Sequence, residues 1–329
     1  MVESRLRFPD RLGALKVRCA IGRMNYRVDP GLYALGVPDE DSPVFVSANF
    51  KMSFDLLREA LPGKNAWILV LDTEGINVWC AAGKGTFGTE ELAGRIEASG
   101  LAGVVRHRKV IVPQLGAPGI SAHEARRLSG FKVVYGPVRA ADLPVFMESG
   151  MKASPGMRIK TFTIGERLSL VPVEIIHALK TFLMVLPLVF LLSGLAGGGF
   201  VSSALRFGWF NSLGLLMAIL AGCVLTPAFL PWLPGRTFSL KGVWPGIACA
   251  LVFLALRTSW SILPHAGVLW AAAWMLIIPA VSAYLAMNFT GCSTFTSLSG
   301  VKKEMRFAVP MQIAALALGT ASWIISIFI

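Results

Sequence analysis

The segment Asp72–Thr89 contains the residue types best suited to chemistry. It combines one thiol, Cys80, with Lys84 and with glycines at positions 75, 83, 85 and 88. Its centre, Asn77–Gly83, is typical of one or two helical turns that end at a glycine. A thiol on a short helix beside a cation is favoured as the thiolate, the form that binds metals. The same residues fit a small buried thiol in a crossover helix equally well, and both interpretations stay open at this point.

Other familiar sites find less support in the sequence. No GxGxxG runs directly into a helix and no GxxxxGK[ST] occurs, which disfavours a dinucleotide site or a P-loop. His107 stands in a basic run and His123 in the first turn of a predicted helix, where solvated histidines are common. Neither belongs to the DxHxxG signature of corrinoid domains that supply a histidine to cobalt.

The five cysteines are widely spaced, and none forms a CxxC pair. This spacing argues against a disulfide framework. It also argues against a structural zinc site or an iron–sulfur cluster held by these residues, since both need clustered ligands.

Strand-like and helix-like stretches alternate in the first half of the chain. Short apolar runs predict strands at 43–49, 66–72, 109–113 and 131–135. The intervening stretches predict helices at 53–61 (capped by Ser53), 89–100, 122–128 (capped by Ser121) and 140–149. This alternation indicates an α/β domain with a mainly parallel sheet, in which ligands bind at the carboxyl ends of the strands. Asp72–Thr89 follows the second predicted strand and is expected at that edge.

The composition divides the chain into a polar half and an apolar half. Hydrophobic residues make up 54% and charged residues 15% of the chain, which excludes a wholly soluble enzyme and a disordered chain. Residues 1–172 hold 23 of the 31 Lys and Arg and 17 of the 19 Asp and Glu. The net charge of +12 therefore splits evenly between the halves, which is not a nucleic-acid signature.

The apolar half predicts an all-α transmembrane domain of five helices. Each apolar segment is about 20 residues long, enough to cross a bilayer, and the segments lie at about 173–194, 210–230, 243–262, 266–288 and 307–329. Basic residues concentrate in the loops after the second and fourth segments, which places these loops and the N-terminal domain in the cytoplasm and the C-terminus outside. Residues 1–13 lack the apolar stretch of a secretory signal.

Ionisable residues in these segments favour anchoring over transport. His177, Lys180 and Arg257 stand near segment ends, where their side chains can reach the interface. A transporter more often shows paired acids or interrupted helices at the midplane. Gly242 and Gly246 fit a small-xxx-small packing motif.

Several stretches resemble known corrinoid proteins. Residues Arg23–Gly36, Ser42–Asp55 and Tyr135–Val138 resemble the corrinoid-binding domain of the corrinoid iron–sulfur protein large subunit of the acetyl-CoA pathway. Asn77–Lys84 agrees at all eight positions with the pattern N-(V/I)-W-C-A-(A/S)-G-K of the mercury-methylating corrinoid protein family. The five following spans and the loop Asn288–Ser297 are similar to that family as well.

This resemblance implies a Rossmann-like corrinoid-binding domain at residues 1–165, a linker at 166–172 and the transmembrane domain at 173–329. It implies a cobalamin-type cofactor over a cap helix, with Cys80 as the catalytic residue and lower cobalt ligand. Glycines would let the backbone approach the corrin, and Thr86 or Thr89 would bond its amides. The implied cofactor-binding residues are Thr73, Asn77, Val78, Trp79, Cys80, Ala81, Ala82, Gly83, Lys84, Gly85, Thr86, Phe87, Gly88, Thr89, Gln114, Leu115 and Gly116.

The expected function is methyl transfer from methylcobalamin to Hg(II) by a protein of the cytoplasmic (inner) membrane. The four-cysteine cluster domain of the acetyl-CoA pathway relative is missing, so the resemblance implies a ferredoxin-like electron donor with two 4Fe–4S clusters. A separate methyltransferase would donate the methyl group, and Cys292 would help to handle Hg(II). The alternatives are a methyl-carrying corrinoid protein of one-carbon metabolism and a transporter with a sensing domain.

Overall fold

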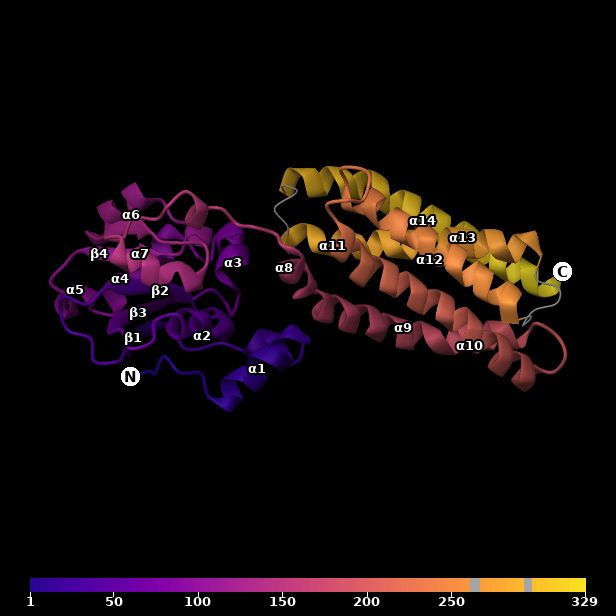
Figure 1. Cartoon of the computed structure of the whole chain (residues 1–329), viewed down its shortest axis with the longest axis horizontal. Helices are drawn as coiled ribbons and strands as arrows, with labels where there is room; N and C mark the ends of the chain where they lie inside the picture. Colours follow the sequence, from indigo (N-terminus) through magenta and orange to yellow (C-terminus); the bar gives the residue numbers. More distant parts are fainter. Residues whose placement is uncertain (261–266, 293–297) are drawn as a thin grey trace. The chain divides into compact units, whose positions relative to one another are not determined.

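The computed structural model describes residues 1–260, 267–292 and 298–329, apart from the side chains of 258–260, 291, 292 and 298. The chain forms two compact units, Met1–Lys160 and Thr161–Ile329. The first unit combines a β-sheet with helices, and the second is built from long helices (Figure 1).

A single mixed sheet forms the centre of Met1–Lys160, a unit in which every residue is described. Its five strands run in the order β1-β3-β2-β4-β5. β2 is parallel to both β3 and β4, and β4 is parallel to β5. The predicted mainly parallel α/β fold is therefore confirmed. The strands are β1 (Gly31–Leu35), β2 (Val44–Ala48), β3 (Ala66–Leu71), β4 (Lys109–Val112) and β5 (Lys132–Tyr135).

The first strand is an addition that the sequence did not predict. β1 pairs antiparallel with β3, so that Gly31 lies opposite Val70 and Leu35 opposite Ala66. It is an edge strand, and all of its residues except Leu35 are only partly buried. A short strand of this kind lacks the continuous apolar run that marks a strand buried on both faces.

Helices cover both faces of the sheet because consecutive strand residues point to opposite sides. Val44 and Val46 pack with α3, α4, α5 and α6, whereas Phe45 packs on the other face with α2 and α7. The helices of this unit are α1 (Phe8–Arg18), α2 (Lys51–Glu59), α3 (Val78–Lys84), α4 (Thr89–Ala98), α5 (Leu101–Val104), α6 (Ala122–Ser129) and α7 (Leu143–Glu148). Short 3₁₀ turns are η1 (Arg23–Asn25), η2 (Gln114–Gly116), η3 (Ala140–Asp142) and η4 (Gly156–Arg158).

Two predicted helix starts have different outcomes. Ser121 caps α6 as expected, since its Oγ accepts a hydrogen bond from the Glu124 N–H. The predicted cap at Ser53 is wrong, because α2 begins at Lys51. The Ser53 N–H bonds to the Phe50 carbonyl at 2.9 Å, so Ser53 already lies inside the first turn.

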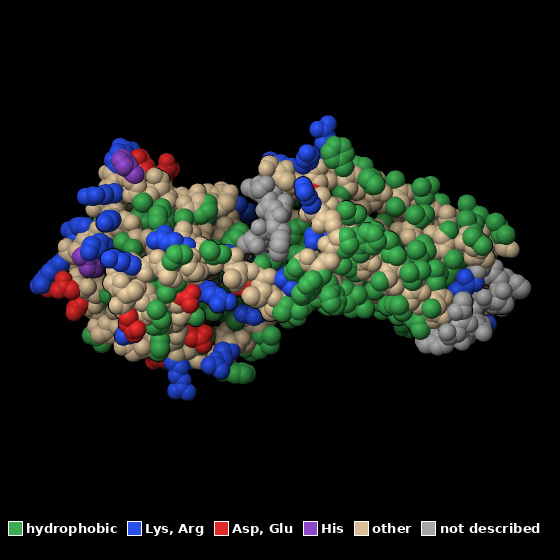
Figure 2. All heavy atoms as spheres, turned by 45° about the horizontal axis from the view of Figure 1, so that its top comes forward, with side chains coloured by type: hydrophobic (Ala, Val, Ile, Leu, Met, Phe, Trp, Pro, Cys, Tyr) green, Lys and Arg blue, Asp and Glu red, His purple; other side chains and the backbone are tan. Residues whose placement is uncertain are grey.

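The second unit holds the predicted membrane helices. Among the described residues, five helices are long and apolar enough to cross a membrane. On the face drawn in Figure 2, hydrophobic side chains cover much of this unit and charged ones are few, whereas charged side chains are spread over the first unit. The elements of this unit are α8 (Ile164–Leu168), α9 (Val171–Gly194), α10 (Phe200–Ile219), the π-helical η5 (Leu220–Leu225), α11 (Thr226–Phe229), α12 (Phe238–Trp260), α13 (Val268–Met287), η6 (Asn288–Cys292) and α14 (Leu298–Phe328).

Small residues let α12 pack closely on α13. A Cβ at Gly242 would lie 2.6 Å from the Ala286 Cβ, and one at Gly246 would lie 2.6 Å from the Pro279 Cα. The Ser282 hydroxyl donates to the Gly242 carbonyl at 2.7 Å across this contact. The small-xxx-small motif thus marks a real helix–helix interface.

Candidate functional site

The carboxyl ends of β2, β3, β4 and β5 lie at one edge of the sheet because these strands are parallel. β3 lies on one side of β2, and β4, which comes later in the chain, lies on the other side of β2. Ligands of open α/β sheets bind at the carboxyl edge where the strand order reverses in this way. α3 contacts both β2 and the η2 turn that follows β4, so it lies at this reversal (Figure 1).

Asn49 holds the turn that leads into α3. This side chain is almost fully buried directly after β2. Its Oδ1 accepts hydrogen bonds from the backbone N–H and hydroxyl of Thr73 and from the Gly75 N–H, at 3.2, 2.8 and 2.9 Å. Its Nδ2 donates to the Asp72 carboxylate at 3.0 Å. These bonds fix the path of the chain between β3 and α3.

α3 presents Cys80 on a well-defined helical turn. The Asn77 side chain caps the helix, because its Oδ1 accepts a hydrogen bond from the Cys80 N–H at 2.9 Å. Val78, Ala81 and Ala82 are buried in the core between α3 and the sheet. The Cys80 thiol is free and partly exposed. The helix therefore holds one thiol in a fixed place at the surface of the carboxyl edge.

The loop after β4 packs tightly beneath α3. A Cβ at Gly116 would lie 2.4 Å from the ring of Phe87, which is fully buried. A Cβ at Gly119 would lie 2.2 Å from the Phe87 carbonyl oxygen and 3.1 Å from the Ala82 Cα. Any side chain at either glycine would push α3 and the segment after it outward.

The C-terminal end of α3 is open on its other side. A Cβ at Gly83 or Gly85 would meet no atom of the described residues within 4 Å. Gly85 ends the helix in the left-handed conformation at a φ of +88°. Both glycines and Lys84 are exposed. Apart from the neighbouring side chains along the chain, such as that of Lys84, nothing therefore blocks the approach of a flat ligand to the backbone at these two glycines.

Two threonines near this opening differ in their hydrogen bonding. Among the described residues, the buried Thr86 Oγ1 has no partner. The Thr89 hydroxyl accepts from the Ser121 N–H at 2.9 Å and lies 3.5 Å from the Gly119 carbonyl oxygen. A buried hydroxyl without a partner costs about 1–3 kcal/mol, which a polar group of a ligand would recover.

The residues singled out from the sequence fall into three groups around α3. Those exposed or partly exposed at its open side are Trp79, Cys80, Gly83, Lys84, Gly85 and Thr86. Those that pack α3 or its flanking segment are Val78, Ala81, Ala82, Phe87, Gly88, Leu115 and Gly116. Those whose side chains are hydrogen-bonded within the loops are Thr73, Asn77, Thr89 and Gln114.

Sequence reasoning missed Asn49 as part of this site. A polar side chain directly after a buried strand was the available signal for Asn49, since β2 ends at Ala48. Gly119 belongs to the loop Gln114–Gly119 that follows β4, and a Cβ there would lie 3.1 Å from the Ala82 Cα of α3.

Two further places have no part in this arrangement. A surface groove of about 550 Å³ contains no residue of α3; it is lined by Ala122, His123, Arg126, Arg127, Lys132 and Val133. Across residues 1–260, 267–292 and 298–329, no cluster of His, Cys, Asp and Glu is suited to hold a metal ion. The side chain of Cys292 and residues 293–297 lie outside the described residues.

The first unit is similar in sequence to known proteins. Residues 18–146 match the sequence profile of the family described as CO dehydrogenase/acetyl-CoA synthase delta subunit. The acetyl-CoA decarbonylase/synthase complex subunit gamma of Methanopyrus kandleri is 32% identical over 123 residues, covering 37% of this chain and 26% of the relative. That of Methanocaldococcus jannaschii is 39% identical over 92 residues, covering 27% and 19%.

A third relative names the cofactor class. The corrinoid/iron-sulfur protein large subunit of Moorella thermoacetica is 27% identical over 127 residues, covering 38% of this chain and 28% of the relative. The chain spans only about a quarter of the length of these curated relatives. The match includes β1 to β5 and all of α3, so it covers the site built above.

Proposed function

We propose that this chain is a membrane-anchored, corrinoid-dependent methyltransferase that passes a methyl group to Hg(II). The observation that carries the proposal is the position of Cys80. Its partly exposed thiol stands on a capped helix at the carboxyl edge of a domain similar to a corrinoid/iron-sulfur protein. The eight-residue pattern Asn77–Lys84 and the five apolar helices, which resemble the mercury-methylating corrinoid proteins, support the choice of acceptor.

The residues around α3 fit a corrinoid, a wide and flat ligand with amide side chains. The open backbone at Gly83 and Gly85 would accept the face of the ring. The partnerless Thr86 hydroxyl would bond one of its amides. Thr73 and Asn77 would act indirectly, by holding the turn and the cap of α3.

When bound, the corrinoid would supply a cobalt-held methyl group with carbanion character for the electrophilic substrate Hg(II). Cys80 would hold the cobalt as a thiolate, which is a soft and strong donor. The buried Val78, Ala81 and Ala82 would keep this sulfur from shifting, because they anchor α3 in the core. Rigid support of this kind is what a reactive constellation needs.

The proposal includes partners. Only five cysteines occur in these 329 residues, and none forms a CxxC pair. We therefore assign electron supply to a ferredoxin-like protein with two 4Fe–4S clusters, and methyl supply to a separate methyltransferase. The proposal also places the N-terminal unit on the cytoplasmic side of the inner membrane and the C-terminus outside, which the basic loops support. Cys292 is proposed to help receive Hg(II).

A second candidate is a methyl-carrying corrinoid protein of one-carbon metabolism. The specific observation in its favour is the similarity to subunits of acetyl-CoA decarbonylase/synthase complexes. In this case the methyl acceptor would be a protein or small molecule of that metabolism, and mercury would react only adventitiously.

The test uses the full chain purified in detergent and incubated without oxygen with a methylated corrinoid. A visible corrinoid band that stays with the protein supports the binding site, and a protein without it contradicts both candidates. Loaded protein is then given Hg(II) or a thiol acceptor. Faster methyl transfer to Hg(II) supports the first candidate, whereas transfer only to the thiol supports the second.

A further inference from the structure

Helix α1 carries an apolar face that nothing in its own unit covers. Phe8, Leu12 and Leu15 follow one another at the spacing of a single helix face. Their exposed fractions are 76%, 37% and 59%. Exposed apolar side chains in this arrangement indicate an interaction surface. α1 ends at Arg18, which is the first residue of the segment that matches a known family.

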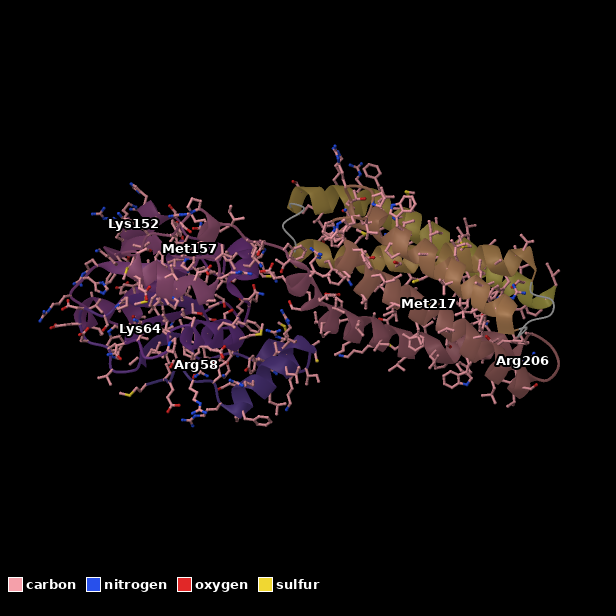
Figure 3. All side chains as sticks on the ribbon, viewed as in Figure 1. Arg58, Lys64, Lys152, Met157, Arg206 and Met217 are labelled. Atoms are coloured by element: carbon pink, nitrogen blue, oxygen red, sulfur yellow. The ribbon has the colours of Figure 1, made fainter. Side chains whose placement is uncertain are left out.

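The opposite face of α1 is fixed to the rest of the unit. The Asp10 carboxylate forms ion pairs with Lys51 at 2.6 Å and with Arg58 at 2.9 Å. Val17 is buried, and Gly13 lies against the ring of Tyr26. Arg58, labelled in Figure 3, thus joins α2 to α1. Because this face is docked, the apolar face cannot turn inward and remains directed away from the unit.

Basic side chains flank the apolar face. Arg11, Lys16 and Arg18 are all exposed. Residues 1–28 contain seven Lys and Arg but only two acids, Glu3 and Asp10, both of which are paired with cations. An apolar stripe bordered by cations is the pattern of a helix that lies in the surface of an anionic membrane.

We propose that α1 lies in the headgroup region of a bilayer that contains anionic lipid. The charge of the flanks is complementary to that surface. The five apolar helices of the same chain keep the first unit near a bilayer by covalent linkage, which raises the effective concentration of α1 at the surface. The inference does not depend on the reaction that the protein catalyses.

Photo-crosslinking in the full chain tests the proposal. Benzoylphenylalanine is introduced at Phe8, at Leu15 or, as a control, at the exposed Leu128 of α6, which covers the other face of the sheet. The protein is reconstituted into vesicles of phosphatidylcholine alone or of equal parts phosphatidylcholine and phosphatidylglycerol. We expect lipid adducts at Phe8 and Leu15 that increase with phosphatidylglycerol, and almost none at Leu128. Adducts only to protein, no adducts, or equal lipid adducts at Leu128 would overturn the proposal.

A charge variant gives a second readout. Arg11→Gln combined with Lys16→Gln leaves the docked face of α1 unchanged. Each lost cation is expected to lower the yield of lipid adducts in the anionic vesicles about fivefold. The yield in phosphatidylcholine vesicles is expected to stay the same. An unchanged yield in the anionic vesicles would show that charge does not hold α1 at the membrane, and would reject the proposal.

Discussion

At the carboxyl edge of the sheet, Gly83 and Gly85 face open space, whereas Gly242 and Gly246 in the helical unit are covered by α13. In the helical unit, a missing side chain lets two helices approach each other. At α3 a missing side chain leaves room that the protein itself does not fill. The contrast shows that the glycines of α12 serve packing, and under the proposed function those at the end of α3 leave room for the corrinoid.

Buried polar atoms without a hydrogen-bond partner occur in both units, so they do not by themselves distinguish a ligand site from a packed helix. Among the described residues, Thr86 Oγ1 is one such atom, but Asn211, Trp274 and Gln312 in the helical unit also have one each. Thr86 differs because it directly follows the exposed Gly85. The proposed ligand site rests on the combination of an open backbone and a partnerless hydroxyl rather than on either feature by itself.

The largest expected effect comes from filling a covered glycine. Gly246→Val would place a branched side chain against the backbone of Pro279, which cannot move away easily. We expect a loss of about 3 kcal/mol in the free energy of unfolding of the helical unit. Thermal unfolding of the full chain in detergent measures it. The matched control is Gly165→Val in α8, where a Cβ meets nothing within 4 Å of the described residues; an equal loss in both variants would contradict the packing role.

The next largest loss of stability is expected for Asn49→Ala, at the carboxyl edge of the sheet. The variant removes an acceptor used by the Thr73 and Gly75 N–H groups and a donor to Asp72. Leaving buried groups unpaired is expected to cost about 2 kcal/mol. Urea unfolding of the full chain measures the cost, with the exposed Asn25→Ala as control. Unchanged stability would mean that the turn before α3 does not depend on Asn49.

The sequence predicted the parallel strands, but not the first strand, β1, or the residues that position the segment Asp72–Thr89. Continuous apolar runs such as Ala66–Leu71 are a local signal for strands buried on both faces. The role of Asn49 depends on bonds to residues more than 20 positions away, which no local pattern records. β1 is short and half-buried, so it lacks such a run. Likewise, α10 begins at Phe200 and α14 at Leu298, because helices extend past the apolar core that hydropathy detects.

Acid is expected to loosen α1 by a smaller amount. Burial alone would raise the pKa of Asp10, but the hydrogen bonds from Lys51, Arg7 and Arg58 outweigh it and lower the pKa from 3.8 to about 2. The ionised Asp10 carboxylate therefore stabilises the docked α1 fully above pH 3.8, and this contribution is lost as the pH falls toward about 2. We expect about 1 kcal/mol, after allowance for solvent screening. Hydrogen exchange of the α1 amides measures it, and Asp10→Asn should remove the pH dependence; a variant that kept it would contradict this assignment.

The smallest effect on stability is expected at the open glycine of α3. Gly83→Leu introduces a side chain into empty space, and replacing a helical glycine should raise stability by about 0.5–1 kcal/mol. The same side chain should obstruct a corrinoid and lower its affinity. Titration with corrinoid, followed by visible absorption, measures the affinity, with Gly94→Leu on α4 as the control. Equal corrinoid affinity in the two variants would show that the space at Gly83 is not used by the ligand.

The most direct test of the central claim is methylmercury production by Cys80 variants of the full chain. Cys80→Ala removes one partly exposed sulfur and leaves the buried residues of α3 unchanged. We expect that Cys80→Ala stays folded in the membrane but loses methyl transfer to Hg(II), and that Cys80→His binds corrinoid yet methylates poorly. Near wild-type methylmercury production by Cys80→Ala would contradict the assignment of Cys80 as the ligand on which the activity depends.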